Sequence, residues 1–344
     1  MVERGSRTIL AGASVALEAG EFVVLLGPSG SGKSTLMKSL AGIVEADAGH
    51  VELEGTRISE LAPKERARQI GVVPQDDIVH RGLRVEDVLR YSARLRLPST
   101  SPPELIDGRV EAVLRVTELG DLRRQRVRRL SGGQRKRVSL GVELLDSPRY
   151  LFLDEPTSGL DPALEEDTMA LFARLAAAGH GVLASTHAMA SLDRADELLV
   201  VMDGRIIFFG PPAAAPGHFG VAHPSEIFRS LRTAEAEQWQ RRFHGTPLRA
   251  RSLGARRGEA RPVADVAPGA RSPTALSAPA TSVARDDKEA AQPIAVASSL
   301  PEVPPEVASA TAAGARLGND AEDVEALLEQ LQAEIKTEDG EGNG

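Results

Sequence analysis

The feature that most constrains this chain is a glycine-rich segment at residues 27–35, flanked by an apolar run at 22–27 and a helical pattern at 33–42. Such a loop between a strand and a helix directs backbone N–H groups, and the positive end of the helix, toward phosphate oxygens. In this pattern Lys33 reaches the β- and γ-phosphates and the Ser34 hydroxyl ligates Mg²⁺. Kinases, GTPases and ATPases share it. The segment reads Gly27-Pro28-Ser29-Gly30-Ser31-Gly32-Lys33-Ser34-Thr35.

A second candidate site follows the apolar run at residues 150–153, which ends in Asp154 and Glu155. In open α/β sheets the carboxyl ends of buried strands face the crevice that holds the ligand. Asp154 is therefore expected to hold the Mg²⁺ shell, and Glu155 to polarise an attacking water. A solvated loop start is the alternative for two adjacent acids.

Strands alternate with helices through the first 243 residues, which indicates a mainly parallel sheet with crossover helices. Further strands are predicted at 181–185 and 198–202, and a hairpin turn at Asp203-Gly204 leads into a strand at 205–209. The stretch from Lys33 to Asp154 is longer than one crossover requires, and its helical patterns predict an inserted helical subdomain at about 76–145. The apolar positions of the two patterns are Val85, Val88, Leu89 and Leu95, then Ile106, Val110, Val113, Leu114 and Thr117.

Composition narrows the function classes. The net charge of −8 argues against a general nucleic-acid binder, and the absence of cysteine excludes disulfides, cysteinyl zinc sites and thiol catalysis. No run approaches the roughly 18 consecutive apolar residues that span a bilayer. A role at a membrane would therefore depend on a partner chain.

Ser131, Gly132 and Gly133 precede a helical pattern that begins at Gln134, and they would form a second anion-binding helix start. One nucleotide needs only one such cradle, so the second is expected to serve the nucleotide of a neighbouring copy. The run Leu130-Ser131-Gly132-Gly133-Gln134-Arg135 closely resembles the signature loop of the ABC ATPases. The other motifs of that family match in order at Val73-Pro74-Gln75, Ser158-Gly159-Leu160-Asp161 and Ser185-Thr186-His187.

The resemblance, which covers roughly residues 9 to 230, implies an α/β P-loop NTPase fold of the ABC ATPase type. It implies a head-to-tail dimer that holds two ATP molecules between Lys33 of one domain and Ser131 of the other. By the same resemblance Glu155 is the general base, His187 senses the γ-phosphate, Gln75 contacts Mg²⁺ and the attacking water, and Asp161 acts across the dimer. ATP and Mg²⁺ are the implied cofactors.

Several phrases resemble the G-type branch of the family, which transports pigment precursors and drugs. They include Gln75-Asp76-Asp77, Gly132-Gly133-Gln134-Arg135-Lys136-Arg137 and His218-Phe219-Gly220. This kinship implies export. Proteins of this branch often have fused ATPase and membrane domains, and no membrane domain follows in this sequence, so a separate transmembrane permease at the cytoplasmic face of the cell membrane is expected, or else the chain is partial. The helical insert is rich in arginine, which suits a surface toward a membrane protein and anionic headgroups or, alternatively, a solvated surface with structural ion pairs.

One position departs from the family pattern. Family members carry an aromatic residue that stacks on adenine, about 23 residues before Gly27, and no aromatic residue precedes Phe22. The guanidinium of Arg4 or Arg7, a residue upstream of this sequence, or a partner are the alternatives for that contact.

Beyond residue 243 the amino-acid composition changes and the periodic pattern ends. Residues 244–319 are rich in Ala, Pro, Ser and Arg without periodicity, which predicts a disordered linker. A short acidic amphipathic helix is predicted at 320–337. It would either fray in isolation or dock on a partner.

Two other functions compete with a transport ATPase. A soluble ABC ATPase in DNA repair or on ribosomes would normally carry zinc cysteines, a long coiled coil or tandem cassettes, and this chain has none of them. A regulatory subunit that binds ATP without turnover is disfavoured by the intact Lys33, Glu155 and His187.

Overall fold

A computed structural model of the chain describes residues 1–5, 7–76, 78–187, 189 and 191–249. Most of the predicted 244–319 linker and all of the predicted 320–337 helix lie outside the described residues. The central sheet has the strand order β10-β9-β3-β8-β7-β6. Its strands are β3 (Phe22–Leu26), β6 (Ile70–Val73), β7 (Tyr150–Leu153), β8 (Gly181–Ser185), β9 (Glu197–Met202) and β10 (Arg205–Gly210).

Five of these strands run parallel, and only β10 pairs antiparallel, with β9. The β9–β10 hairpin turns at Asp203 and Gly204, whose φ angles of 46° and 74° are typical of a two-residue type I′ turn. The predicted mainly parallel α/β sheet is confirmed. The strand β6 has no counterpart in the sequence-based prediction, since a four-residue run that contains a glycine gives little signal.

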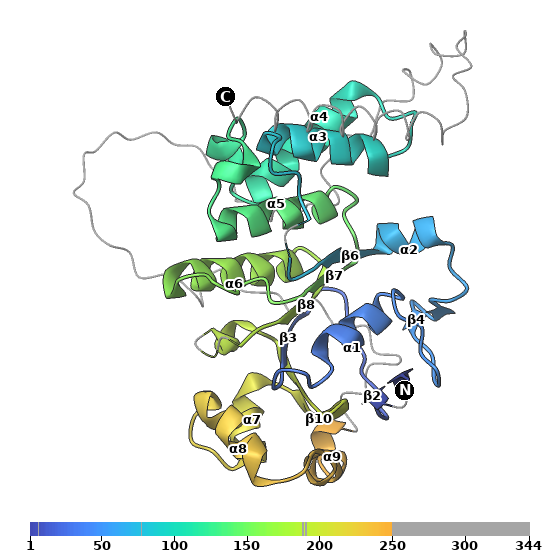
Figure 1. Ribbon diagram of the computed structural model, residues 1–344, viewed down its shortest axis with the longest axis vertical. Coiled ribbons are helices and arrows are strands. Elements are labelled where there is room, and N and C mark those ends of the chain that lie inside the picture. Colours follow the sequence, from blue (N-terminus) through green and yellow to red (C-terminus); the bar gives the residue numbers. More distant parts are fainter. Residues whose placement is uncertain (6, 77, 188, 190, 250–344) are drawn as a thin grey trace, which may run out of the picture.

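The side chains of β3 alternate between the two faces of the sheet, as a strand buried on both sides requires. Phe22, Val24 and Leu26 pack on the face that α6 (Pro162–Ala177) covers, and the Phe22 and Phe172 rings lie 6.1 Å apart. Val23 and Leu25 pack on the opposite face with α1 (Lys33–Leu40). Figure 1 shows these two helices on opposite sides of the sheet.

Three helices form a separate lobe beyond α6, at the top of Figure 1. They are α3 (Val85–Arg96), α4 (Pro103–Val116) and α5 (Gly132–Leu144). Of the four apolar positions predicted on one face of the first helix, Val85, Val88 and Leu89 are buried, whereas Leu95 is 36% exposed. Leu95 follows Val88 by seven residues and so lies about 20° from it around the helix, on the same face, but in the last turn of α3.

At the opposite end, α7 (Ala215–Phe219), α8 (Ile227–Ser230) and α9 (Ala236–His244) pack beside β10, at the bottom of Figure 1. The remaining elements are β1 (Val2–Arg4), β2 (Arg7–Leu10), β4 (Glu52–Leu53), β5 (Thr56–Arg57) and α2 (Pro63–Gln69). Short 3-10 turns lie at Gly120–Leu122, Val127–Arg129, Leu192–Arg194, Pro212–Ala214, Pro224–Glu226 and Leu231–Thr233.

No helix in the described part of the chain combines the length and the apolar composition that crossing a lipid bilayer requires.

Candidate active site

The loop between β3 and α1 is a tightly wound cradle that only glycine permits at its first position. A Cβ on Gly27 would lie 2.2 Å from the Val201 carbonyl oxygen and 2.6 Å from Ser31 Oγ. Gly30 and Gly32 adopt φ angles of 76° and 102°, which L side chains rarely take. The loop therefore turns back over the start of α1, with Ser29 and Gly30 exposed at its tip.

Lys33, the first residue of α1, places its ammonium group inside this cradle. Its Nζ donates hydrogen bonds to the carbonyl oxygens of Gly27, at 2.8 Å, and Pro28, at 3.1 Å. The side chain is buried, and burial lowers the pKa of Lys33 against the raising effect of the nearby Glu155 and Asp154 carboxylates. A buried cation held by loop carbonyls is ready to accept a stronger anionic partner.

The cradle fits a phosphate chain. The Ser31 hydroxyl is buried without a hydrogen-bond partner in the described part of the structure, so the cradle wall offers an unused donor. Ser34 and Thr35 follow Lys33 in the first turn of α1, where backbone N–H groups have no intrahelical acceptor.

The two acids predicted from the sequence lie at the end of β7, beside the end of β8. A buried residue that the sequence analysis did not select, Ser185, holds both of them in place. The Ser185 hydroxyl donates to Asp154 Oδ1 and accepts from the Glu155 N–H, each at 2.8 Å. The sequence did carry a signal for Ser185, since it is a polar residue at the end of an apolar strand and lies two positions before His187.

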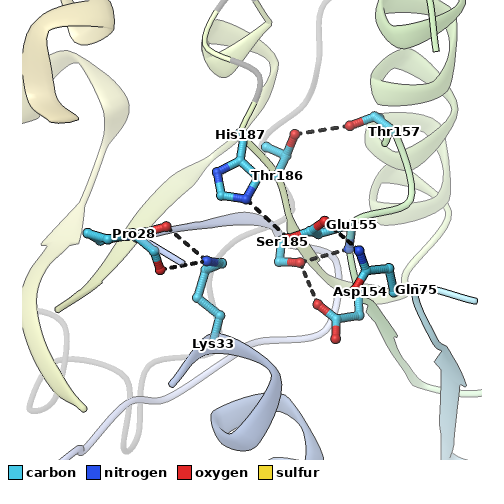
Figure 2. Close-up of polar contacts among 10 residues, drawn as sticks. Pro28, Lys33, Gln75, Asp154, Glu155, Thr157, Ser185, Thr186 and His187 are labelled. Carbon is cyan, nitrogen blue, oxygen red and sulfur yellow. Dashed lines mark hydrogen bonds and ion pairs between the residues drawn. The ribbon is translucent and has the colours of Figure 1, made fainter. Parts of the chain in front are cut away.

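Glu155 is the residue on which the site converges (Figure 2). Gln75 Nε2 donates to Glu155 Oε2 at 2.9 Å, and His187 Nε2 lies 3.1 Å from Glu155 Oε1. Gln75 follows β6, Glu155 follows β7 and His187 follows β8, so three neighbouring strand ends supply the three side chains. The φ of Glu155 is 47°, an uncommon backbone conformation for a residue other than glycine and one that clusters at functional sites.

The predicted second cradle stands at the start of α5, which begins at Gly132 and not at Gln134 as the sequence suggested. Ser131 is the N-cap, and its hydroxyl accepts from the Gln134 N–H at 3.2 Å. Gln134 Oε1 accepts in return from the Ser131 N–H at 2.9 Å, which completes a capping box. The N–H groups of Gly132 and Gly133 stand in the first turn, where an anion is favoured.

These residues do not join the first site. Within the described ranges, no hydrogen bond or ion pair links Ser131, Gly132, Gly133 or Gln134 to Lys33, Asp154 or Glu155. A link exists further along α5, where Lys136 Nζ donates to the carbonyl oxygens of Pro74 and Gln75. Asp161 caps α6, since its Oδ1 accepts from the N–H groups of Ala163 and Leu164.

The position of an adenine contact stays a prediction. Arg4 is exposed at the end of β1, and the next strand, β2, packs its Ile9 and Leu10 against Gly32 and Gly204.

Known proteins resemble this chain in sequence and in fold. The family model described as ABC transporter matches residues 10–158. Among curated proteins, the ABC transporter ATP-binding/permease protein Rv1747 of Mycobacterium tuberculosis is 42% identical over 231 residues, which cover 66% of this chain and 26% of that protein. The ABC transporter G family member 22 of Arabidopsis thaliana is 38% identical, over 62% of this chain and 29% of the plant protein.

A "Probable ABC transporter ATP-binding protein" of Azorhizobium caulinodans is 33% identical over 60% of this chain and 74% of its own length. By contrast, the chain spans only about a quarter to a third of the length of the mycobacterial and Arabidopsis proteins.

Two solved structures are similar. One is a dimeric post-hydrolysis state of the ATP-binding cassette MJ0796 bound to ADP and Pi, with a TM-score of 0.55, 25% identity and coverage of 61% of this chain and 94% of that one. The other is an ATP-binding subunit of an ABC transporter, with a TM-score of 0.58, 26% identity and coverage of 67% and 95%.

Proposed function

Because this chain belongs to the ABC transporter ATP-binding proteins and carries their ATPase domain, we propose that it hydrolyses ATP between two head-to-tail domains to drive transport through a permease. The observation that carries the proposal is the convergence of Gln75 and His187 on the two carboxylate oxygens of Glu155, beside the Lys33 cradle.

The cradle binds the triphosphate of the substrate ATP. Backbone N–H groups of residues 27–35 and the ammonium of Lys33 meet the phosphate oxygens, and the hydrogen bonds of Lys33 to Gly27 and Pro28 give way to bonds with phosphate. When bound, Mg²⁺ supplies charge neutralisation on the phosphates, and Ser34, Gln75 and Asp154 are the residues that would hold it.

Glu155 acts as the general base. Its carboxylate accepts a proton from an attacking water and so raises the nucleophilicity of that water. Gln75 and His187, which hold one oxygen each, fix the orientation of the carboxylate, and His187 contacts the γ-phosphate in the closed site. Ser185 fixes the backbone of Glu155, because its hydroxyl accepts a hydrogen bond from the Glu155 N–H.

The second half of each site comes from a neighbouring domain. The start of α5 presents an anion-binding helix end formed by Ser131, Gly132, Gly133 and Gln134. Asp161, the N-cap of α6, follows Leu160, whose side chain lies against Gly133. Two copies arranged head to tail bring each start of α5 to the triphosphate of the other copy. The similar MJ0796 cassette is dimeric in its post-hydrolysis state, which supports this arrangement.

The proposed partners are a second ATPase domain and a transmembrane permease on a separate chain, at the cytoplasmic face of the cell membrane. The similarity to G family members supports export as the direction of transport. The acidic net charge of −8 supports a role without nucleic acid.

The first test uses a Glu155→Gln variant. Loss of the base lowers the ATPase rate by a factor on the order of 10² or more while ATP binding persists. Light scattering after gel filtration with Mg²⁺ and ATP is expected to show a dimer of Glu155→Gln and a monomer of Lys33→Ala, which lacks the phosphate-binding cation. Removal of Mg²⁺ with EDTA abolishes turnover of the unmodified protein.

A Glu155→Gln protein that hydrolyses ATP at the unmodified rate contradicts the assigned base. A protein that stays monomeric with ATP, even beside its co-purified permease, contradicts the shared site. Identification of the proteins that co-purify from detergent-solubilised membranes tests the partner: a polytopic permease supports transport, whereas ribosomes or DNA alone contradict it.

A further inference from the structure

Five exposed arginines lie together on two loops that border the helical lobe. Residues 81–86 and 123–128 run antiparallel and are joined by backbone hydrogen bonds, among them Arg128 N–H to Arg81 O at 2.8 Å and Val127 N–H to Leu83 O at 2.9 Å. An isolated β-bridge pairs Arg84 with Arg126. We call this surface the arginine patch; its exposed members are Arg81, Arg84, Arg124, Arg128 and Arg129.

The structure separates these arginines from the others of the helical insert. Arg96 pairs with Glu143 and Asp146, Arg90 with Asp107, and Arg123 with Glu86 and Glu111. Within the described ranges, no ion pair involves the five members of the patch. Five like charges on adjoining loops repel each other, so an anionic partner bound to this surface would reduce their electrostatic repulsion.

The sequence of this chain contains a segment of the complementary charge. Residues 320–341 carry nine acidic side chains and one basic one, and their apolar side chains recur at helical spacing. The acids are Asp320, Glu322, Asp323, Glu325, Glu329, Glu334, Glu338, Asp339 and Glu341, and the base is Lys336. We call these residues the acidic segment.

The connecting chain is long enough for the two to meet. Residues 250–319 separate the acidic segment from Arg249, the last described residue. A chain of roughly 70 residues with the disorder that the sequence predicts for this stretch has a root-mean-square span of about 40–50 Å, compared with a radius of gyration of about 18 Å for a domain of roughly 243 residues. Tethering also keeps the local concentration of the segment near the millimolar range.

We propose that the acidic segment docks on the arginine patch of its own chain and restrains the ATPase cycle. The patch lies between two motifs of the proposed function, on which this inference rests: Arg81 follows Gln75 by six residues, and Arg129 precedes Ser131 by two. A segment bound there holds both loops and obstructs the approach of a second domain. Salt, or a stronger partner for the patch, releases it.

Chemical cross-linking tests the docking without any ATPase measurement. The chain has no cysteine, so a pair of introduced cysteines forms the only thiol pair. In the full-length protein, His80→Cys lies exposed beside Arg81, and Ser59→Cys lies exposed after β5 as the matched control. Each is combined with Thr337→Cys and treated with a short bismaleimide at low salt.

We expect the intramolecular cross-link at His80→Cys to form at least five times faster than at Ser59→Cys. The difference is expected to disappear in 0.5 M NaCl, where the screening length is roughly half of its value at physiological salt. Charge reversal of Arg81, Arg84 and Arg124 to Glu is expected to remove the preference. Reversal of Glu322, Glu325 and Glu329 to Lys in that same protein is expected to restore it.

Equal cross-linking at the two positions overturns the proposal. Co-sedimentation of the protein with phosphatidylglycerol vesicles that depends on the patch, together with equal cross-linking, assigns the patch to a lipid surface instead.

The proposed restraint of the ATPase cycle by the acidic segment is tested separately, through the ATPase rate. Removal of residues 320–344 is expected to raise the ATPase rate about threefold or more at low salt and to leave it unchanged in 0.5 M NaCl. A preferential cross-link without any change of rate overturns the restraint. A protein without ATPase activity in any form contradicts the proposed function, and the cross-linking result still decides the docking.

Discussion

At the scale of single residues, the two acids of the site depend on a neutral neighbour, Ser185. Ser185 bonds to the carboxylate of Asp154 and to the backbone N–H of Glu155, and it is fully buried. Its hydroxyl thus fixes the distance between the two acids, and it supports the unusual backbone conformation of Glu155. Ser185 is a positioning residue, because its contacts act through the two carboxylates.

Replacement of Ser185 by alanine is expected to lower kcat for ATP at least tenfold and to leave KM within about threefold, because the cradle that binds the triphosphate is untouched. The free energy of unfolding is expected to fall by about 1–3 kcal/mol, since two partly buried polar groups lose their partner. Steady-state kinetics and urea unfolding measure both quantities.

Ser230→Ala is the matched control for this change. Its hydroxyl is also buried and donates to the Phe219 carbonyl oxygen at 2.7 Å, far along the chain from the site. A similar loss of stability with an unchanged kcat is expected. If both variants lose stability and both keep kcat, the role assigned to Ser185 is wrong.

At the scale of elements, the helical lobe is attached to the sheet through a partly buried ion cluster. Arg96, the last residue of α3, bonds to Glu143 of α5 at 2.6 Å and to Asp146 just beyond α5 at 3.3 Å. Glu143 Oε2 also accepts from the Val72 N–H of β6 at 3.3 Å. One arginine therefore joins two helices of the lobe to the edge strand that leads to Gln75.

Arg96→Gln is expected to destabilise the protein by about 2–3 kcal/mol, because it leaves two largely buried carboxylates without their cation. Arg90→Gln is the comparison on the same helix. The Arg90–Asp107 pair is 39% and 58% exposed, and its loss is expected to cost less than about 1 kcal/mol. Urea unfolding measures the free energy of unfolding of both variants. An equal decrease in the two would contradict a structural role for the buried ion cluster.

At the scale of the whole molecule, stability is expected to depend on pH through a buried histidine. His218 of α7 lies among Phe208, Phe219, Trp239 and Phe243, and its Nε2 donates to the Ile207 carbonyl oxygen at 3.0 Å. Burial, aided by the charge of Arg242, lowers the pKa of His218 from 6.5 to about 4 against the effect of that hydrogen bond.

Between pH 6.5 and about 4, His218 is therefore protonated in the unfolded chain but neutral in the folded chain. The contribution of His218 to stability is complete above pH 6.5 and is lost as the pH falls toward about 4, by roughly 3 kcal/mol in total. Urea unfolding between pH 4 and pH 7 measures this slope. His218→Gln, which keeps a donor but does not titrate, is expected to show a shallower slope, and parallel curves would contradict the assignment.

The sequence alone determined those features that depend on neighbouring residues in the chain. The glycines of residues 27–35, the strand that ends in Asp154 and the Asp203-Gly204 turn are each specified by local backbone geometry. The mainly parallel α/β fold followed from the alternation of apolar runs and helical patterns. The strand β6 escaped detection because four residues carry too little periodicity.

The tertiary structure alone decided which distant residues meet. The order β3-β8-β7-β6 places the ends of four strands side by side, and this order brings Ser185, Glu155 and Gln75 together although 80 residues separate Gln75 from Glu155. It also sorted the arginines of the helical lobe into ion-paired side chains and an exposed patch. Contacts of this kind depend on the packing of whole elements, and no local pattern in a single sequence encodes the choice among the possible packings.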